Sequence, residues 1–458
     1  MRKKVFIHCE ITKREFDAKV LLSATAALEG FEIYLGNILG LRLTQIPRYS
    51  IYHHKDCTPD ELNLNLFKNL KKNKIYITCQ DEEIGLEEKK IFFTKLPIGV
   101  FYYRFGIKSI KLVDAILTWS NYDYKNLLKR FKNYKQRIFR TGSPRADLWS
   151  KKFENFYNSN NKKKYILVSS HTGGISFHKS FEEILEISKN AYFFKDKYRF
   201  DKLKKLYFEE YSNRTKYFFK LSNSLIKLAN KFPKQQIIFR PHPVESLEKW
   251  KYIFKDCKNI IVSKENTSTY WMRRAKVLIQ NGCYTSIEAA NLGVDIITFL
   301  PSEIKKYAKP FSSSLGMQCK TYDDLFSTVN KFLKNEKRLE YMKIKKKNFK
   351  LVNERFDFPK EQSNSKKIVT VWQKITSKSE NQYNLFQEFF FKNYIILKKI
   401  KYSLYKLFFK PKLDVDGKFQ DISLDDVSVK IEILNKLLDK EKKIKFKLIN
   451  NQLIKFYI

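Results

Sequence analysis

A histidine between two prolines stands where a short apolar run of the sequence ends. Residues 237–239 are Ile-Ile-Phe, the letters RPHP follow with His242 as the third, and Glu245 comes soon after. Proline donates no hydrogen bond to a sheet, so the predicted strand ends here, and the second proline stiffens the backbone around the imidazole. Open α/β sheets bind ligands at the carboxyl ends of their strands. The pattern predicts that His242 donates to a phosphate and that Arg240 or Glu245 steadies it.

A glycine and two hydroxyl residues open a predicted helix farther along the chain. Gly282 ends a strand candidate, Thr285 and Ser286 follow, and Glu288 lies in the first helical turn. The amino end of a helix presents backbone N–H groups and the positive end of its dipole, which suits a phosphate. We expect the hydroxyls to add donors and Glu288 to accept from ribose hydroxyls. The alternative is an ordinary helix with Ser286 as its N-cap.

Three consecutive carboxylates, Asp81, Glu82 and Glu83, follow the strand candidate 74–80. Transfer of an activated group to a hydroxyl needs a base for the hydroxyl proton and groups that stabilise the leaving charge. We expect one of the three to be that base; the alternative is a solvated acidic turn.

Further charged residues are candidates for binding an acceptor or a sugar. Glu10 and Arg14 lie near the first strand–helix junction, and Arg145 follows a later strand candidate. Arg145 equally fits a structural clamp between lobes.

No metal and no cofactor are expected. The six cysteines are scattered without zinc spacing, and no Asp-x-Asp pair stands before a strand end to hold a divalent ion. His53 and His54 with Asp56 and Cys57 form a candidate cluster. Adjacent histidines on a loop, however, point apart in most conformations.

Strands and helices alternate along the chain and would position these residues. Apolar runs predict strands at 4–10, 31–37, 74–80, 115–121, 137–143, 165–174, 236–243, 259–266, 276–282 and 295–301. Such alternation is typical of parallel sheets covered by helices. A lysine-rich break at 158–164 favours two domains. We expect an α/β fold of two Rossmann-like lobes facing a cleft, over residues 1–155 and 160–350; the alternative is one large sheet.

The remainder of the chain differs in composition. We expect residues 351–380 to return as a helix to the N-terminal lobe and residues 381–458 to form a basic aromatic tail. Within 385–410, lysines and aromatic residues recur at helical spacing, which fits an interfacial helix on an anionic membrane. The alternative is a helix packed on the protein's own surface. No role is assigned to residues 411–458.

The net charge of +42 raises the question of a nucleic-acid partner. No recognisable nucleic-acid module accompanies the charge, so we expect none and interpret the lysines as biased residue usage. The apolar runs are too short for a signal peptide or a spanning helix. These features predict a cytoplasmic protein, peripheral at the inner membrane.

The spacing of the motifs resembles known families. RPHP with Glu245, followed by Asn281-Gly282, Ser286-x-Glu288 and Gly293, resembles the donor-binding lobe of GT-B glycosyltransferases. Among these it is most similar to enzymes that use CMP-sugars, the bacterial sialyltransferases and the transferases of 3-deoxy-manno-octulosonic acid (Kdo).

Segments 10–22, 81–86 and 141–149 resemble the bacterial surface carbohydrate biosynthesis protein family, and the likeness covers roughly residues 4–375. The resemblance implies a nucleotide-sugar-binding C-terminal lobe in which His242, Thr285 and Ser286 hold the phosphate of CMP. Ile84 separates the acidic residues from Gly85, so the resemblance leaves open which carboxylate is the base. Val294-Asp295 replaces a proline that is common in GT-B enzymes.

Taken together, these features predict a metal-independent glycosyltransferase of bacterial surface polysaccharide, that is, of lipopolysaccharide or capsule. It would transfer Kdo or a related ulosonic acid from a CMP donor to a glycan or lipid-linked acceptor. The alternatives are a sugar-nucleotide epimerase acting on a UDP-sugar, a polyol-phosphate transferase, and a non-catalytic scaffold that binds anionic glycan or lipid.

Overall fold

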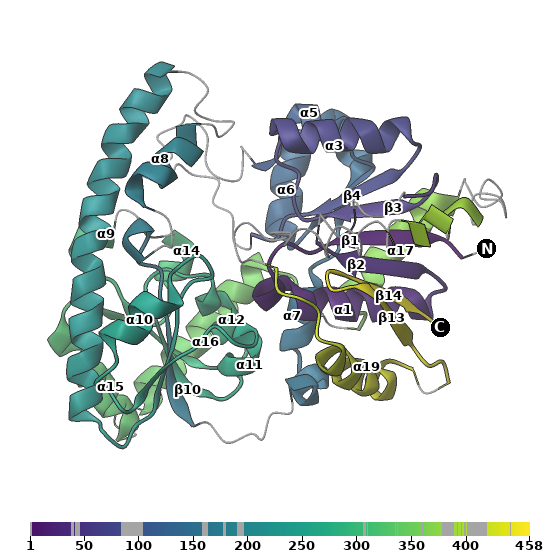
Figure 1. Ribbon diagram of the computed structural model, residues 1–458. Helices are drawn as coiled ribbons and strands as arrows, with labels where there is room; N and C mark the ends of the chain where they lie inside the picture. Colours follow the sequence, from purple (N-terminus) through teal and green to yellow (C-terminus); the bar gives the residue numbers. More distant parts are fainter. Residues whose placement is uncertain are drawn as a thin grey trace. The chain divides into compact units, whose positions relative to one another are not determined.

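The computed structural model in Figure 1 describes residues 2–37, 41, 46–83, 104–157, 164–176, 180–189, 197–305, 308, 310–334, 336, 338–359, 361–377, 389–391, 393–394, 396–397, 400, 419–439 and 441–458. The described residues form two compact units. Unit 1 comprises residues 2–82, 104–157 and 355–458, and unit 2 comprises Glu83 and residues 164–354.

Unit 1 contains an eight-stranded sheet with the order β13-β14-β2-β1-β3-β4-β5-β6. Its strands are β1 (Lys4–His8), β2 (Glu32–Gly36), β3 (Ile51–His54), β4 (Tyr76–Gln80), β5 (Ala115–Thr118), β6 (Ile138–Arg140), β13 (Lys445–Asn450) and β14 (Leu453–Tyr457). Strands β1 to β6 pair in parallel, and this confirms the predicted parallel sheet. The strand order reverses between β1 and β3, which is where such sheets bind ligands.

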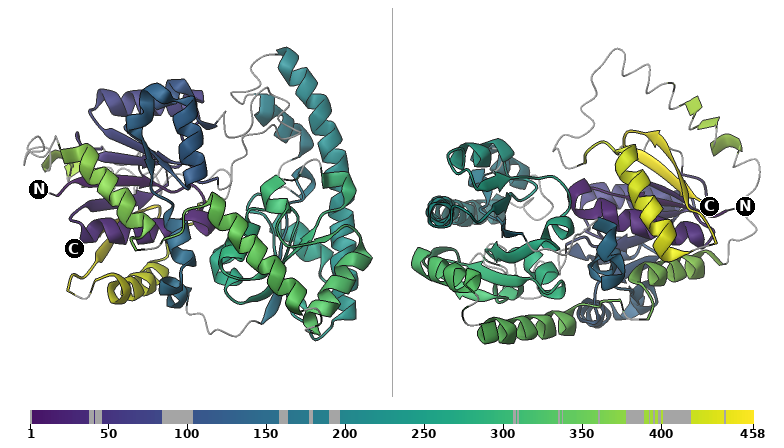
Figure 2. Two further views of the ribbon diagram at one scale, coloured as in Figure 1. Left: turned by 180° about the vertical axis from the view of Figure 1, so that it is seen from behind. Right: turned by 90° about the horizontal axis from the view of Figure 1, so that it is seen from below.

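Helices cover the sheet of unit 1. Helix α1 (Thr12–Leu28) contacts α7 (Pro144–Trp149), α17 (Asn364–Thr376) and α19 (Leu424–Leu438). Figure 2 shows the light-green helix α17 against the sheet. From this helix the indole N–H of Trp372 donates to Thr78 Oγ1 at 3.2 Å. Helices α3 (Glu61–Lys72) and α6 (Asn121–Arg130) begin after side-chain caps, Asp60 and Ser120. A short helix, α5 (Ile107–Ile110), contacts α3.

The last described residues extend the sheet of unit 1. This extension was not predicted from the sequence. Strand β14 pairs antiparallel with β2, and β13 pairs with β14. Apolar side chains drive this docking, because Leu453, Ile454 and Phe456 are fully buried. Residues 419–458 are therefore an integral part of unit 1 and not a tail.

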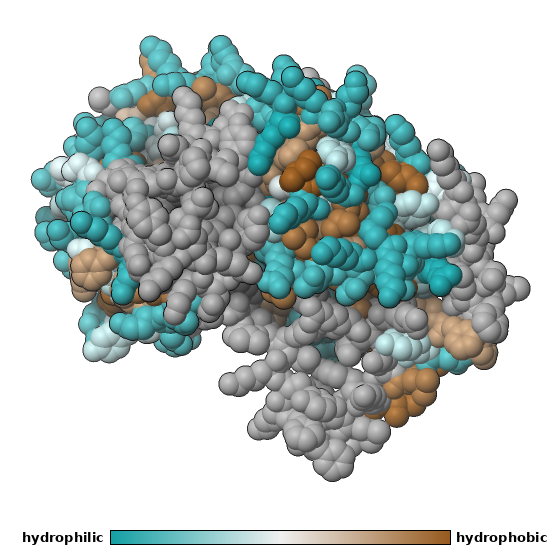
Figure 3. Space-filling view, turned by 90° about the horizontal axis from the view of Figure 1, so that it is seen from above, coloured by the Kyte–Doolittle hydropathy of each residue, from teal (hydrophilic) through white to brown (hydrophobic). Residues whose placement is uncertain are grey.

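Most of the predicted interfacial helix lies outside the described residues. Its described Phe391 is buried and packs edge-on against Phe6 and Tyr34, as the alternative of packing on the protein's own surface requires. Phe389 and Phe390 are exposed. Among the described residues no helix is long and apolar enough to cross a membrane. Hydrophilic side chains cover most of the described residues on the face in Figure 3, with smaller apolar patches between them.

Unit 2 contains a six-stranded parallel sheet with the order β12-β11-β10-β7-β8-β9. Its strands are β7 (Tyr165–Ser169), β8 (Ile237–Arg240), β9 (Ile260–Val262), β10 (Ala275–Gln280), β11 (Asp295–Phe299) and β12 (Met317–Cys319). Five of them confirm predicted strands, and β12 was not predicted. The order reverses between β7 and β10.

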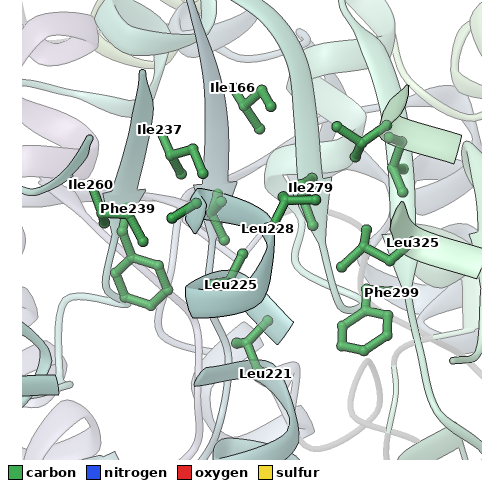
Figure 4. Close-up of a cluster of buried hydrophobic side chains, with 14 of the residues drawn as sticks. Ile166, Leu221, Leu225, Leu228, Ile237, Phe239, Ile260, Ile279, Phe299 and Leu325 are labelled. Carbon is green, nitrogen blue, oxygen red and sulfur yellow. The ribbon is translucent and has the colours of Figure 1, made fainter. Parts of the chain in front are cut away.

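The core of unit 2 lies between the sheet and the helices α9 (Lys197–Lys231), α10 (Leu247–Ile253) and α15 (Tyr322–Leu333). Leu221, Leu225 and Leu228 repeat on one face of α9 and point at the strands in Figure 4. The remaining helices of unit 2 are α8 (Phe181–Lys189), α11 (Ser268–Met272), α12 (Thr285–Asn291), α13 (Ser302–Lys305), α14 (Pro310–Ser313) and α16 (Arg338–Arg355).

Candidate functional site

Three neighbouring strands of unit 2 end in polar segments at one edge of the sheet. Strand β8 leads into His242, β10 leads into residues 281–285, and β7 between them leads into residues 170–173. Neighbouring strands lie about 4.8 Å apart, so these segments are within reach of one small ligand. The structure therefore brings His242, Gly282 and Thr285 to the same sheet edge.

Glu245 holds the segments after β7 and β8 together. Its carboxylate is fully buried and accepts hydrogen bonds from the Ser170 hydroxyl, from the Thr172 N–H at 2.9 Å and hydroxyl at 3.0 Å, and from Trp250 Nε1 at 3.0 Å. The backbone N–H of His242 donates to it at 3.2 Å. Glu245 thus fixes the backbone that carries the imidazole.

Arg240 turns toward a different loop. Its guanidinium donates to the carbonyl oxygens of Glu265 and Asn266 and lies over the ring of Trp271. Burial lowers the pKa of Arg240 to about 10. These contacts order the loop before α11.

The two hydroxyls at the start of α12 have different surroundings. The Ser286 hydroxyl is buried and lies 2.9 Å from the Cys283 carbonyl oxygen and 3.1 Å from the Ser312 carbonyl oxygen. Thr285 Oγ1 is buried and has no hydrogen-bond partner among the described residues. Gly282 has φ +87°, which favours glycine. Of the two hydroxyls, that of Ser286 has described partners and that of Thr285 has none among the described residues.

Glu288 is also occupied by the protein. Its carboxylate accepts from the Ser268 hydroxyl at 2.7 Å and from the Thr269 hydroxyl. These bonds tie α12 to α11.

Sequence reasoning missed three residues of this edge, His171, Arg214 and Asn281. The rings of His171 and His242 have centroids 5.3 Å apart and meet at 85°. Arg214 Nη1 lies 3.3 Å from His171 Nδ1, and Asn281 Nδ2 donates to the His171 carbonyl oxygen at 2.8 Å. Asn281 Oδ1 is buried, and no described residue donates a hydrogen bond to it. The signal was the position of His171, which lies near the end of a predicted strand, as His242 does.

The corresponding edge of unit 1 holds a network of ion pairs. Lys19 Nζ lies 2.8 Å from Glu15 Oε2 and 3.0 Å from Glu82 Oε1. Burial alone would lower the pKa of Lys19, but the carboxylates outweigh it and raise that pKa. Burial would likewise raise the pKa of Glu15, but Lys19 and Arg14 hold it well below its ordinary value. Lys55 pairs with Glu10 at 2.6 Å.

The remaining predicted residues of this group are Asp81 and Arg145, which belong to unit 1, and Glu83, which directly follows Glu82 in sequence and belongs to unit 2. Asp81 Oδ2 pairs with Arg104 Nε at 2.5 Å, and Glu83 is half-buried. The guanidinium of Arg145 lies over the ring of Trp119, and its Nη1 donates to the Glu82 carbonyl oxygen at 3.3 Å. These contacts of Arg145 lie within unit 1.

His53 and His54 lie on strand β3, so their prediction as loop residues was wrong. His54 Nε2 lies 3.1 Å from Asn63 Oδ1, and its Nδ1 lies 3.2 Å from His8 Nδ1. His53 Nδ1 lies 2.9 Å from Thr78 Oγ1. The alternation of a strand sends the two rings to opposite faces. Among the described residues, no group of three or more His, Cys, Asp or Glu side chains could hold a metal ion.

Comparisons with known proteins show a likeness of fold and not of sequence. No family model and no curated protein matches the chain. A variant of the wall teichoic acid polymerase TagF soaked with CDPG has a TM-score of 0.52 and 12% identity, over 83% of this chain and 90% of that chain. A second TagF variant has a TM-score of 0.50 and 12% identity, over 82% and 90%. The UDP-GlcNAc 2-epimerase from Neisseria meningitidis bound to UDP-GlcNAc has a TM-score of 0.46 and 12% identity, over 82% and 100%. The likeness to TagF, together with the parallel strands β1–β6 of unit 1 and β7–β12 of unit 2, shows that this chain has a GT-B fold of two Rossmann-like units.

Proposed function

We propose that the protein is a glycosyltransferase of bacterial surface glycan biosynthesis that binds the phosphate of a nucleotide-activated sugar at the sheet edge of unit 2. The gathering of His171, His242, Asn281 and Thr285 at the switch point of that sheet carries the proposal. Imidazole N–H groups and a hydroxyl donate to phosphoryl oxygens, and a carboxamide oxygen accepts from a hydroxyl. A nucleotide offers both kinds of group.

The donor we propose is a CMP-activated sugar, Kdo or a related ulosonic acid. A CMP donor carries a single phosphate, which matches a site with neutral donors at the strand ends. During transfer the bond from the sugar to the phosphate breaks, and negative charge develops on the phosphate. Donors held in place by Glu245 and Asn281 would stabilise that charge without further rearrangement.

Unit 1 supplies the acceptor side in this proposal. One of Asp81, Glu82 and Glu83 takes the proton of the acceptor hydroxyl, and Glu10 and Arg14 bind the acceptor. These residues follow β1 and β4, at the carboxyl ends of the strands. Asp81 and Glu82 are each paired with a cation, so the acceptor would enter a charged, hydrogen-bonding environment.

A nucleotide screen tests the proposed donor. Thermal unfolding of the full chain is measured with CMP, CDP, UDP and GDP, for the wild type, for His242→Ala, and for Lys258→Ala as a control in the same unit. We expect the strongest stabilisation from CMP, with an affinity about 10- to 100-fold lower in His242→Ala, because a hydrogen bond to a charged group is lost. Stabilisation by UDP or GDP in preference to CMP would contradict the CMP donor.

Product analysis separates the alternative enzymes. Release of CMP from CDP-glycerol would identify a polyol-phosphate transferase, and turnover of a UDP-sugar without an acceptor would identify an epimerase. Full activity of His242→Ala in restoring surface polysaccharide to a mutant strain would instead favour the non-catalytic scaffold.

We also propose that the segment around Phe391 docks on an anionic membrane. Phe391 is anchored in unit 1, whereas Phe389, Phe390 and Leu397 are 64%, 55% and 65% exposed. Exposed aromatic residues in a lysine-rich segment fit the interface of a bilayer with anionic headgroups. In cosedimentation with vesicles of phosphatidylcholine and phosphatidylglycerol, we expect a combined Phe389→Ser and Phe390→Ser variant to lose binding. Phe219→Ser removes an equally exposed aromatic ring from α9 and should bind normally; equal binding by both variants would contradict the proposal.

A further inference from the structure

The segment after β7 carries a second imidazole beside His242. His171 follows the strand that lies between β8 and β10 at the switch point of unit 2. Its ring centroid is 5.3 Å from that of His242, and the two planes are nearly perpendicular at 85°. The two rings therefore meet at the same end of neighbouring strands.

The partner of His171 Nδ1 fixes the position of the ring proton. Arg214 Nη1 lies 3.3 Å from this nitrogen. A guanidinium has only N–H donors and does not lose its proton in proteins, so Nδ1 is the acceptor. The proton of the imidazole is therefore on Nε2, the nitrogen on the other side of the ring.

His242 has the same arrangement with a backbone donor. The N–H of Val244 lies 3.5 Å from His242 Nδ1, a long contact in which the amide nitrogen is the donor. The ring proton is again on Nε2. Both rings thus carry their N–H on the nitrogen farther from the backbone.

Arg214 is itself held firmly. Its side chain is buried, its Nε donates to Glu210 Oε1 at 2.6 Å, and its Nη1 also donates to the His171 carbonyl oxygen at 3.2 Å. Gly173 has φ +80°, and a Cβ there would lie 2.3 Å from Arg214 Cδ. Only glycine lets the loop pass this close to the arginine.

A buried acceptor completes the arrangement. Asn281 is 4% exposed, and its Nδ2 is used by the His171 carbonyl oxygen. Its Oδ1 has no hydrogen-bond partner within the described ranges of the chain. A buried carboxamide oxygen without a donor is uncommon and favours a ligand that supplies a hydroxyl or an N–H group.

We propose that His171 is a second ligand of the donor phosphate: its Nε2–H donates to a phosphoryl oxygen alongside that of His242, with Arg214 as the positioning residue and Asn281 as the acceptor for a donor hydroxyl. This inference rests on the proposed function, because it assigns further residues to the same nucleotide site. In this proposal the phosphate is bound by two neutral N–H donors, one after each of the adjacent strands β7 and β8.

Two amide substitutions separate the two ring nitrogens. The amide nitrogen of glutamine reaches the position of Nε2, whereas that of asparagine reaches the position of Nδ1. Binding of CMP and of cytidine to the full chain is measured by calorimetry for the wild type, His171→Gln and His171→Asn. We expect His171→Asn to weaken CMP about 10- to 100-fold and His171→Gln to stay within about threefold of the wild type. Cytidine, which has no phosphate, should bind all three equally.

Three results would overturn the assignment of His171: CMP affinities unchanged in both variants, rescue by asparagine and not by glutamine, or a parallel loss of cytidine binding. A wild type that binds no nucleotide would instead overturn the proposed donor, and this inference with it.

The role of Arg214 has its own spectroscopic readout. In ¹⁵N spectra of histidine-labelled protein, we expect the Nε2–H form of His171 in the wild type and in Arg214→Lys, and a mixture of both forms in Arg214→Met. A pure Nε2–H form in Arg214→Met would overturn the positioning role.

Discussion

The strand ends at the two switch points differ in how their polar groups are satisfied. In unit 1, buried Lys19 joins Glu15 and Glu82, and every one of these three charges has a partner of opposite sign. In unit 2, Asn281 Oδ1 and Thr285 Oγ1 are buried and have no hydrogen-bond partner in the part of the chain that the structure describes. Ion pairs hold loops together in the absence of any ligand, whereas partnerless polar groups reduce stability until a ligand binds. The comparison shows that the buried charges of unit 1 are paired before any acceptor binds, whereas two buried polar atoms at the edge of unit 2 still lack a described partner.

The largest expected effect tests the ion pairs of unit 1. Replacement of Lys19 by methionine leaves the buried carboxylates of Glu15 and Glu82 without their cation. We expect the free energy of unfolding to fall by about 3–5 kcal/mol, as measured by urea unfolding. Lys436→Ala, which removes an exposed pair with Glu432, should change it by less than about 0.5 kcal/mol. Equal effects of the two variants would remove the distinction between the two edges.

The next effect tests whether unit 2 also depends on a buried carboxylate. Glu245→Gln has nearly the same shape but turns one acceptor into a donor that faces other donors, among them the Trp250 indole and the His242 N–H. We expect a loss of about 2–3 kcal/mol in unfolding free energy and weaker CMP binding. Unchanged CMP affinity would show that Glu245 does not support His242.

The buried histidines of unit 1 should make the unfolding free energy depend on pH. Burial lowers the pKa of His54 to about 4, and burial together with His54 lowers that of His8 well below its usual value. Unfolded histidine takes up a proton below about pH 6.5, whereas folded His54 does so only near pH 4. The unfolding free energy contributed by His54 is therefore complete above pH 6.5 and falls by about 1.4 kcal/mol for each pH unit between 6.5 and 4.

Two buried carboxyl groups change the unfolding free energy with pH in the opposite direction. The test therefore compares the pH dependence of a His54 variant with that of the wild type. Burial raises the pKa of Asp123 to about 7 and that of Asp147 to about 6. The folded state takes up these protons first, so these groups add stability as the pH falls. Between pH 6.5 and 5, we expect the unfolding free energy of His54→Phe, measured with urea, to change less with pH than that of the wild type. The difference between the two slopes should correspond to the uptake of about one proton on unfolding. An equal dependence in both proteins would contradict the assigned pKa of His54.

The smallest expected effect on stability tests whether the Thr285 hydroxyl of unit 2 serves a ligand. Thr285→Val removes a hydroxyl that has no protein partner. We expect the unfolding free energy without ligand to stay within about 0.5 kcal/mol of the wild type, while CMP affinity decreases. A large loss of stability would mean that the hydroxyl serves the fold and not a ligand.

Most parallel strands of both units were predictable because they are short apolar runs that end in polar turns; the exceptions are β3 and β12. Strand β3 was missed because His53 and His54 interrupt its apolar pattern, although both are buried. Strand β13 carries lysines at alternate positions, Lys445 and Lys447, and β14 carries one lysine, Lys455, as an edge hairpin does. Their partner β2 lies near the other end of the chain, and no local pattern reports such a pairing.

At the site, the position of a residue was easier to predict than the direction of its side chain. His242 stands at a strand end because prolines stop the strand, which is a local effect. The inward direction of Ser286 and Glu245 depends on Ser312, Ser170 and other residues far away in sequence. The placement of His171 on the sheet edge follows from the strand order, which the sequence alone does not supply.

The pairing of β14 with β2 also has a consequence for synthesis. Arg2 Nη1 donates to the carbonyl oxygen of Ile458 at 2.8 Å, so unit 1 joins the first and last described residues. All six strands of unit 2 lie between residues 165 and 319. A ribosome releases the amino end first, so unit 2 has all its strands before unit 1 does. Until β14 emerges, β2 carries an open edge that invites pairing with other nascent chains, which makes prompt capture by a chaperone valuable.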